Sequence, residues 1–258
     1  MTEKKIAGVT AVIPTPQKNK EILTKLIEAL ERDTAVTEIL LIDNSLIGFK
    51  HSSNKLTVIT PEENLFVNPS WNLGVAKAKT EIVALLNDDI ILPENYCGDV
   101  ASSMSSEMGI VGVNGMGIEP LPETFCHPQK ENIYLEPTNF MDDYYGIAMF
   151  FFKEAYNRIP DEIKIVYGDS WIFTHCQRMK RQNYRICGCT IYHYGSLSSS
   201  QIEFNPIAKV DAKIYKKLTV KWYHRLFSYE EIWDCHKYRL LGMTLKIKKK
   251  KPWGKRYA

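Results

Sequence analysis

The sequence predicts an α/β fold built on a doubly wound, mostly parallel sheet. Short continuous apolar runs recur through the first half, which is typical of strands buried on both faces. Segments with apolar residues at helical spacing lie between these runs, and such strand–helix alternation favours a parallel sheet covered by helices. The 258 residues are 45% hydrophobic and 24% charged, which excludes a disordered chain and allows a sizeable core.

The first strand is expected over residues 8–13, where it is ended by Pro14 and Pro16. Asn19 is expected to cap the helix that follows, whose apolar residues recur at helical spacing. A second helix is expected to open at Asn68-Pro69 and to bury Trp71 on one face. Four further buried strands are expected at Ile39–Ile42, Leu56–Ile59, Ile82–Leu86 and Ile110–Val113.

The second half has a different character. Prolines at 120, 122, 128 and 137 predict a long irregular loop over about 117–139, and such loops are often binding elements. Beyond the loop we expect a strand over Tyr144–Phe152, helices around Lys153–Arg158 and Ser170–Gln182, and a strand over Arg185–Tyr192. Beyond Gly195 the chain becomes serine-rich, then helical and basic.

Charge is distributed unevenly along the chain. The net charge is +3, but Lys246–Ala258 holds seven basic residues and no acid, which leaves −4 on residues 1–245. This disfavours a globally basic nucleic-acid binder. The chain shows no signal peptide, no apolar stretch long enough to span a bilayer and no disulfide framework, so we expect a cytoplasmic protein with free thiols.

Acidic residues follow a predicted buried strand at Asn87, Asp88 and Asp89. In an open parallel sheet, ligands bind beyond the carboxyl ends of the strands. Adjacent carboxylates repel each other unless a cation lies between them, and oxygen ligands suit Mg²⁺ or Mn²⁺. The alternative interpretation is a turn and helix cap.

Two more residues are candidates for the same site. Asp169 precedes a predicted helix, where it would act either as an N-cap or as a carboxylate general base. His193 ends the last predicted strand, where it would be either structural or a metal ligand.

Taken in order, these segments resemble a family 2 glycosyltransferase with a GT-A fold. The resemblance covers roughly residues 7–195, and its individual motifs are weak while their order is specific. The matching segments are Val9–Thr15, Glu38–Ser45, Asn64–Ala76, Leu85–Asp89 and Tyr167–Asp169. The sequence departs from the family pattern at four positions. Asn87 and Trp171 stand where an acidic residue is usual, Gly168 stands where Glu is usual, and Leu65 stands where Gly is usual.

The resemblance implies a role for each matching residue. Asp89 would coordinate Mn²⁺ or Mg²⁺ with support from His193, and Asp169 would deprotonate the acceptor hydroxyl. Residues implied to contact the donor nucleotide are Pro14, Thr15, Asp43, Asn72, Asn87 and Asp88. Trp171 and Tyr194 are expected on the acceptor side.

The implied activity is transfer of a sugar from a nucleoside-diphosphate sugar to a hydroxyl acceptor with inversion. UDP is the first expectation for the nucleotide, with dTDP or GDP open, and the acceptor would be a glycan or a lipid-linked molecule. The expected division is a donor half at 1–115, an acceptor half at 116–200 and a C-terminal helical region at 201–258. The basic tail would contact a membrane surface or nucleic acid, or only aid solubility. A nucleotidyltransferase and a non-catalytic nucleotide-sugar-binding module remain the alternatives.

Overall fold

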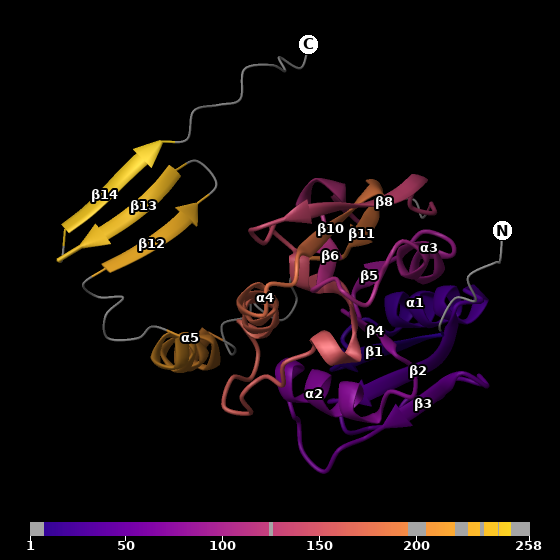
Figure 1. The fold of residues 1–258 in the computed structure, drawn as a ribbon. Coiled ribbons are helices and arrows are strands. Elements are labelled where there is room, and N and C mark those ends of the chain that lie inside the picture. The colour runs from indigo at the N-terminus through magenta and orange to yellow at the C-terminus, as the bar shows by residue number, and fades with distance from the viewer. Residues whose placement is uncertain are drawn as a thin grey trace. The chain divides into compact units, whose positions relative to one another are not determined.

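The computed structural model describes residues 8–123, 126–195, 205–219, 227–232, 235–241 and 243–248. The chain divides into two compact units, residues 1–212 and residues 213–258 (Figure 1). The larger unit contains the central sheet and every residue predicted to bind the donor, the metal or the acceptor or to act as the base. Within the described residues, no helix is both long and apolar enough to cross a membrane.

An eight-stranded sheet with the order β3-β2-β1-β4-β9-β6-β10-β8 forms the centre of the larger unit. Its strands are β1 (Val9–Thr15), β2 (Val36–Asp43), β3 (Leu56–Ile59), β4 (Ile82–Leu86), β6 (Val111–Val113), β8 (Lys130–Thr138), β9 (Ala148–Phe152) and β10 (Asn183–Cys189). Only β9 and β8 run against the others, since β9 pairs antiparallel with both β4 and β6, and β8 pairs antiparallel with β10. The predicted mostly parallel sheet is confirmed.

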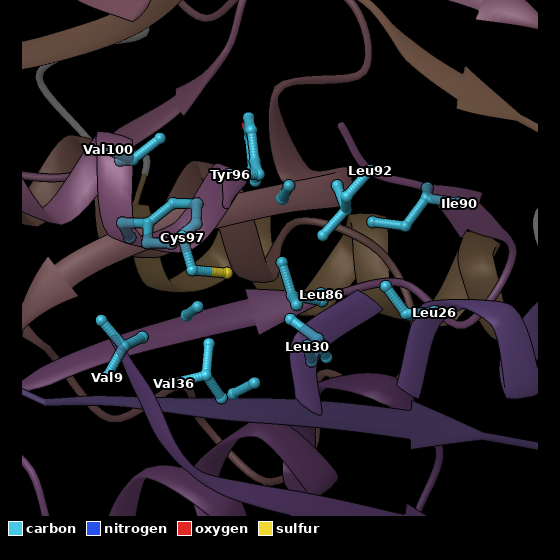
Figure 2. Close-up of a cluster of buried hydrophobic side chains, with 14 of the residues drawn as sticks. Val9, Leu26, Leu30, Val36, Leu86, Ile90, Leu92, Tyr96, Cys97 and Val100 are labelled. Atoms are coloured by element: carbon cyan, nitrogen blue, oxygen red, sulfur yellow. The ribbon is translucent and has the colours of Figure 1, made fainter. Parts of the chain in front are cut away.

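Helices cover both faces of this sheet. Successive side chains of β1 point to opposite sides, so both faces present apolar residues that a helix must cover. Val9, Ala11 and Ile13 join a core with helices α1 (Lys20–Arg32) and α3 (Tyr96–Ser102). Figure 2 shows part of this core, with Leu26 and Leu30 from α1 and Tyr96 from α3. Val12, on the opposite face, contacts α2 (Val67–Lys77) at Gly74.

Helix α1 starts as predicted, whereas helix α2 does not. Asn19 caps α1 as predicted, since its side chain accepts a hydrogen bond from the Ile22 backbone N–H at 3.1 Å. Helix α2 begins at Val67, so Asn68 lies inside the first turn and is not its cap. The Asn68 side chain instead donates to the Val166 carbonyl, which ties α2 to a segment nearly a hundred residues later.

A second, three-stranded sheet has the order β5-β11-β7 and lies beyond the strand ends that carry the polar residues. It consists of β5 (Ile90–Ile91), β7 (Ile118–Pro120) and β11 (Ile191–His193). Antiparallel pairing places His193 opposite Ile90. The two- and three-residue strands thereby bring the chain after Asp89 next to the end of β11.

Several predicted elements of the second half are wrong. Residues 117–139 contain β7 and the nine-residue β8 in place of an irregular loop. Pro137 is tolerated because β8 is the edge strand of its sheet, where a missing N–H leaves no ladder bond unmade. The expected helix at Lys153–Arg158 is only a 3₁₀ turn over Lys153–Ala155, and helix α4 covers Gly168–Arg178.

The C-terminal prediction holds for one element only. Helix α5 (Asn205–Thr219) forms, but 227–248 contain the strands β12 (Phe227–Ile232), β13 (Cys235–Leu240) and β14 (Met243–Lys248) in place of helix. Alternating apolar residues such as Met243, Leu245 and Ile247 have the period of a strand. Residues 249–258, which hold most of the basic tail, lie outside the described residues. The six cysteines are free, as expected.

Candidate active site

A cavity of about 520 Å³ opens at the carboxyl ends of β1, β2 and β4. The predicted residues that line it are Pro14, Asn87, Asp88, Asp89, Asp169 and His193. They come from β1, the turn after β4, the start of α4 and the end of β11. Segments far apart in sequence therefore meet at the sheet edge where ligands of such folds bind.

Asp88 is held at the cavity by the end of β1. Its Oδ2 accepts a hydrogen bond from Thr15 Oγ1 at 2.5 Å, and Thr15 Oγ1 in turn accepts from the Gln17 backbone N–H at 2.8 Å. Burial raises the pKa of Asp88 to about 6; the hydrogen bond from Thr15 opposes this rise and the negative charge of Asp89 adds to it. A nearby positive charge would favour the ionised form of Asp88.

The surroundings of the Asp89 carboxylate suit a bound cation. Its Oδ1 lies 3.3 Å from His193 Nε2, but this approach lacks hydrogen-bond geometry, so the buried oxygen has no hydrogen-bond partner among the described residues. An unpartnered carboxylate oxygen beside an imidazole nitrogen fits Mn²⁺, which accepts both ligand types. No group of three potential ligands is gathered within the described residues.

Asp169 is the second residue of α4 and faces the cavity. Tyr167 holds the N-cap position, so the alternative interpretation of Asp169 as the cap is wrong. Its Oδ1 accepts from the Ser170 backbone N–H at 2.7 Å. Burial raises the pKa of Asp169. A Cβ on Gly146 would lie 2.9 Å from Asp169 Oδ2, so a side chain at this position would crowd the carboxylate.

Asp43 and Asn72 lie outside the lining of the cavity. Asp43 is fully buried and accepts hydrogen bonds from Gln17, Ser45 and Gly48. Burial by itself would raise its pKa, but these hydrogen bonds outweigh burial and lower it. Asn72 is buried, and it bonds the backbone of Ile159 through both its amide nitrogen and its oxygen. The structure thus gives Asn72 contacts that anchor a loop.

The acceptor-side prediction also changes. Trp171 donates its indole N–H to the Arg158 carbonyl at 3.1 Å, and neither Trp171 nor Tyr194 lines the cavity. Tyr144 and Tyr167 line it instead, and both have positive φ angles, 62° and 68°. A left-handed backbone is costly for a bulky residue and marks functional segments. Tyr167 begins the segment Tyr167–Asp169 that resembles the family, and Tyr144 lies two residues before Gly146.

Further acidic residues line the same cavity. Asp142 and Asp143 precede Tyr144 and were missed because nothing in their local pattern points to a site. Arg185 Nη1 lies 3.4 Å from Asp142 Oδ2. Burial raises the pKa of Asp142, and the nearby Arg185 opposes that rise.

The sequence matches the model of Glycosyl transferase family 2 over residues 10–176. No curated protein matches it significantly.

Solved structures share the fold at low identity. GalNAc-T7 with UDP, GalNAc and Mn²⁺ matches with a TM-score of 0.60 and 12% identity, covering 86% of this chain and 50% of that one. TarS of S. aureus matches with a TM-score of 0.51 and 13% identity, covering 84% of this chain and 41% of that one. The chain thus spans half or less of the length of these two proteins. The sheet, the helices on both faces and these matches show a GT-A fold, and the chain belongs to glycosyl transferase family 2.

Proposed function

We propose that this protein transfers a sugar from a nucleoside-diphosphate sugar to a hydroxyl group of an acceptor, with inversion at the anomeric carbon. One observation carries the proposal: the Asp88–Asp89 pair and the separately positioned Asp169 open into one cavity of about 520 Å³ at the strand ends. Membership of glycosyl transferase family 2 supports the reaction class.

Asp88, Asp89 and His193 would hold Mn²⁺ or Mg²⁺ together with the donor diphosphate. The bound ion would supply Lewis-acid stabilisation of the negative charge that develops on the leaving diphosphate. The hydrogen bond from Thr15 holds the Asp88 carboxylate in place at the cavity. Burial raises the pKa of Asp88 and the charge of Asp89 adds to this rise, so a cation close to the pair would favour the state in which both carboxylates are ionised.

Asp169 would accept the proton of the acceptor hydroxyl as that oxygen attacks the anomeric carbon. Burial raises the pKa of Asp169, which makes its carboxylate a stronger base than an exposed one. One base and direct attack from the face opposite the leaving group suffice for inversion. A retaining double displacement needs a second carboxylate as nucleophile.

The donor nucleotide is proposed from the family resemblance, and the acceptor contacts are proposed from the residues that line the cavity. UDP is the first candidate nucleotide, with dTDP and GDP next, and the fold neighbour described with UDP and Mn²⁺ favours the same starting choice. Pro14 and Asn87 line the donor side of the cavity. Asp43 is proposed to contact the nucleobase only if the Gln17 side chain, which donates a hydrogen bond to it, moves away. Tyr144 and Tyr167 offer ring faces for stacking on a sugar of a glycan or lipid-linked acceptor.

Release of nucleoside diphosphate from a panel of nucleotide sugars, with and without Mn²⁺, tests the proposal. We expect one nucleotide sugar to be cleaved, and we expect chelator or Asp89→Ala to abolish cleavage while Glu62→Gln, an exposed control on another loop, leaves it unchanged. Cleavage by none of the donors, with or without candidate acceptors, would contradict sugar transfer and favour a non-catalytic binding module. Pyrophosphate release from a nucleoside triphosphate would instead favour the nucleotidyltransferase alternative.

Membrane contact by the basic tail is a separate proposal, and it concerns residues largely outside those described. Four consecutive lysines at 248–251 would each contribute about 1 kcal/mol near an anionic surface. Binding to vesicles with and without anionic lipid, compared with binding to single-stranded nucleic acid, separates the two partners considered for this tail. Association with neither would leave solubility as its role.

A further inference from the structure

The loop that leads into α4 forms one wall of the cavity. Ile165, Val166 and Tyr167 line it, and two residues later the chain reaches Asp169. This loop has no regular secondary structure, yet a base that takes a proton from an attacking oxygen must be placed within hydrogen-bond reach of it. Some other part of the chain must therefore fix the loop.

Asp211, on α5, supplies three hydrogen bonds to this loop. Its Oδ1 accepts from the Lys164 backbone N–H at 3.0 Å, and its Oδ2 accepts from the N–H groups of Ile165 at 2.7 Å and Val166 at 3.0 Å. The residue is fully buried. A buried carboxylate carries a large desolvation cost, which converging hydrogen bonds from three successive N–H groups offset.

Asn68, on α2, holds the same loop by its carbonyl groups. The Asn68 backbone N–H donates to the Lys164 carbonyl at 2.9 Å, and its side-chain amide donates to the Val166 carbonyl at 3.2 Å. A Cβ on Gly168 would lie 2.1 Å from Asn68 Oδ1, so the start of α4 packs directly against this side chain. The peptide groups of the loop are thus fixed from two helices, with N–H groups bound to α5 and carbonyls bound to α2.

The bonding pattern requires a carboxylate at position 211. Two oxygens accept from three donors, whereas an asparagine would present one oxygen and an NH₂ group that cannot accept. At least one partly buried loop N–H would then lack an acceptor, which is costly.

We propose that Asp211 is a positioning residue of the active site, which sets the loop at 164–167 and through it the carboxylate of Asp169. This inference rests on the proposed function for the role of Asp169 and adds an element of the fold outside the family match at 10–176. Asp211 acts through the loop and contacts no reacting group.

Hydrogen exchange and kinetics on Asp211→Asn test the proposal in the full-length chain. We expect the amides of 164–166 to exchange about tenfold faster or more, with amides of the central strand β1 unchanged. We expect kcat for nucleotide-sugar cleavage in the presence of acceptor to fall about 10²-fold, while KM for the donor changes less than about twofold. Glu162→Gln, which removes a nearby exposed carboxylate, is the matched control.

The outcomes separate positioning from general stability. Leu30→Ala, in the core beneath α1, lowers Tm without touching the loop, and it should retain wild-type kcat at a temperature where it stays folded. Asp211→Glu keeps both oxygens and should recover part of kcat; it carries the same test if Asp211→Asn does not fold. Unchanged protection at 164–166, or a kcat loss shared with Leu30→Ala, would overturn the proposal. If the wild-type protein cleaves no nucleotide sugar, the proposed function fails, and the exchange result alone decides whether Asp211 fixes the loop.

Discussion

Replacing Asp88 with asparagine should stabilise the metal-free protein while it removes sugar transfer. Burial raises the pKa of Asp88 from 3.8 to about 6, so the folded state holds this proton more tightly than the unfolded state does. Below the unfolded pKa of 3.8, Asp88 is protonated in both states and does not change the free energy of unfolding. Above about pH 6 it is ionised in both states and lowers the free energy of unfolding by the full amount. Asparagine is never charged, and its oxygen can still accept the hydrogen bond from Thr15.

The size of the effect follows from the shift of about two pH units, at about 1.4 kcal/mol each. The expected gain in free energy of unfolding is about 3 kcal/mol at pH 8 and about 1 kcal/mol at pH 4.5. For a chain of this size, the gain at pH 8 corresponds to a rise in Tm of about 6–12 °C. These are upper values, since the side chain is only partly shielded from solvent.

The assay is thermal and urea unfolding of wild type and Asp88→Asn in EDTA at both pH values. Glu62→Gln is the charge-matched control, and as an exposed substitution it should change stability by less than about 0.5 kcal/mol. A gain of equal size at both pH values, or a loss of stability at pH 8, would refute the electrostatic reasoning.

The same variant should respond differently to ligand. A ligand that binds only the folded state at 100 times its Kd stabilises by about 2.7 kcal/mol. We expect Mn²⁺ with a nucleoside diphosphate to raise the Tm of the wild type and to raise that of Asp88→Asn much less. An equal rise in both proteins would show that Asp88 has no part in holding the cation.

Three further predictions concern catalysis and packing. Asp169→Asn should lower turnover about 10²–10⁴-fold while leaving the Tm rise with Mn²⁺ and nucleotide intact; a parallel loss of ligand response would argue against a role as base. The kcat/KM for donor cleavage should fall as the pH drops below about 6, because the pKa of Asp88 in the free enzyme is raised to about 6 and the raised pKa of Asp169 acts in the same direction; a flat profile down to pH 5 would contradict this. Gly74→Ala should destabilise by about 1–3 kcal/mol, because its Cβ would lie 2.1 Å from Val12 Cγ1, whereas Lys77→Ala on the exposed side of α2 should be nearly neutral in urea unfolding.

Local sequence pattern was sufficient for the elements that are buried on both faces. Continuous apolar runs predicted β4 (Ile82–Leu86) and its neighbours because a central strand must bury every side chain. The small sheet of β5, β7 and β11 could not be predicted, since its strands have two or three residues and pair across long stretches of chain. Its stability depends on partners that no local pattern reveals.

Part of the active site could also be predicted from the sequence. The order of strands and the polar residues at their ends pointed to Asp88, Asp89, Asp169 and His193, and all four line one cavity. For Asp88 and Asp89 this worked because parallel strands deliver their carboxyl ends to a common edge, whereas Asp169 comes from the start of α4 and His193 from the small sheet.

The amino-acid sequence by itself thus determined the buried strands at the centre of the sheet, the acidic end of β4 and the family. Only the tertiary structure decided which side chains face the cavity, since Asn72 and Trp171 turn to backbone partners while Tyr144 and Asp142 turn inward. It also brought Asp211 to the loop before Asp169, across more than forty residues of sequence. The physical reason is that a side chain's orientation depends on hydrogen-bond partners and packing that become neighbours only when the chain has folded.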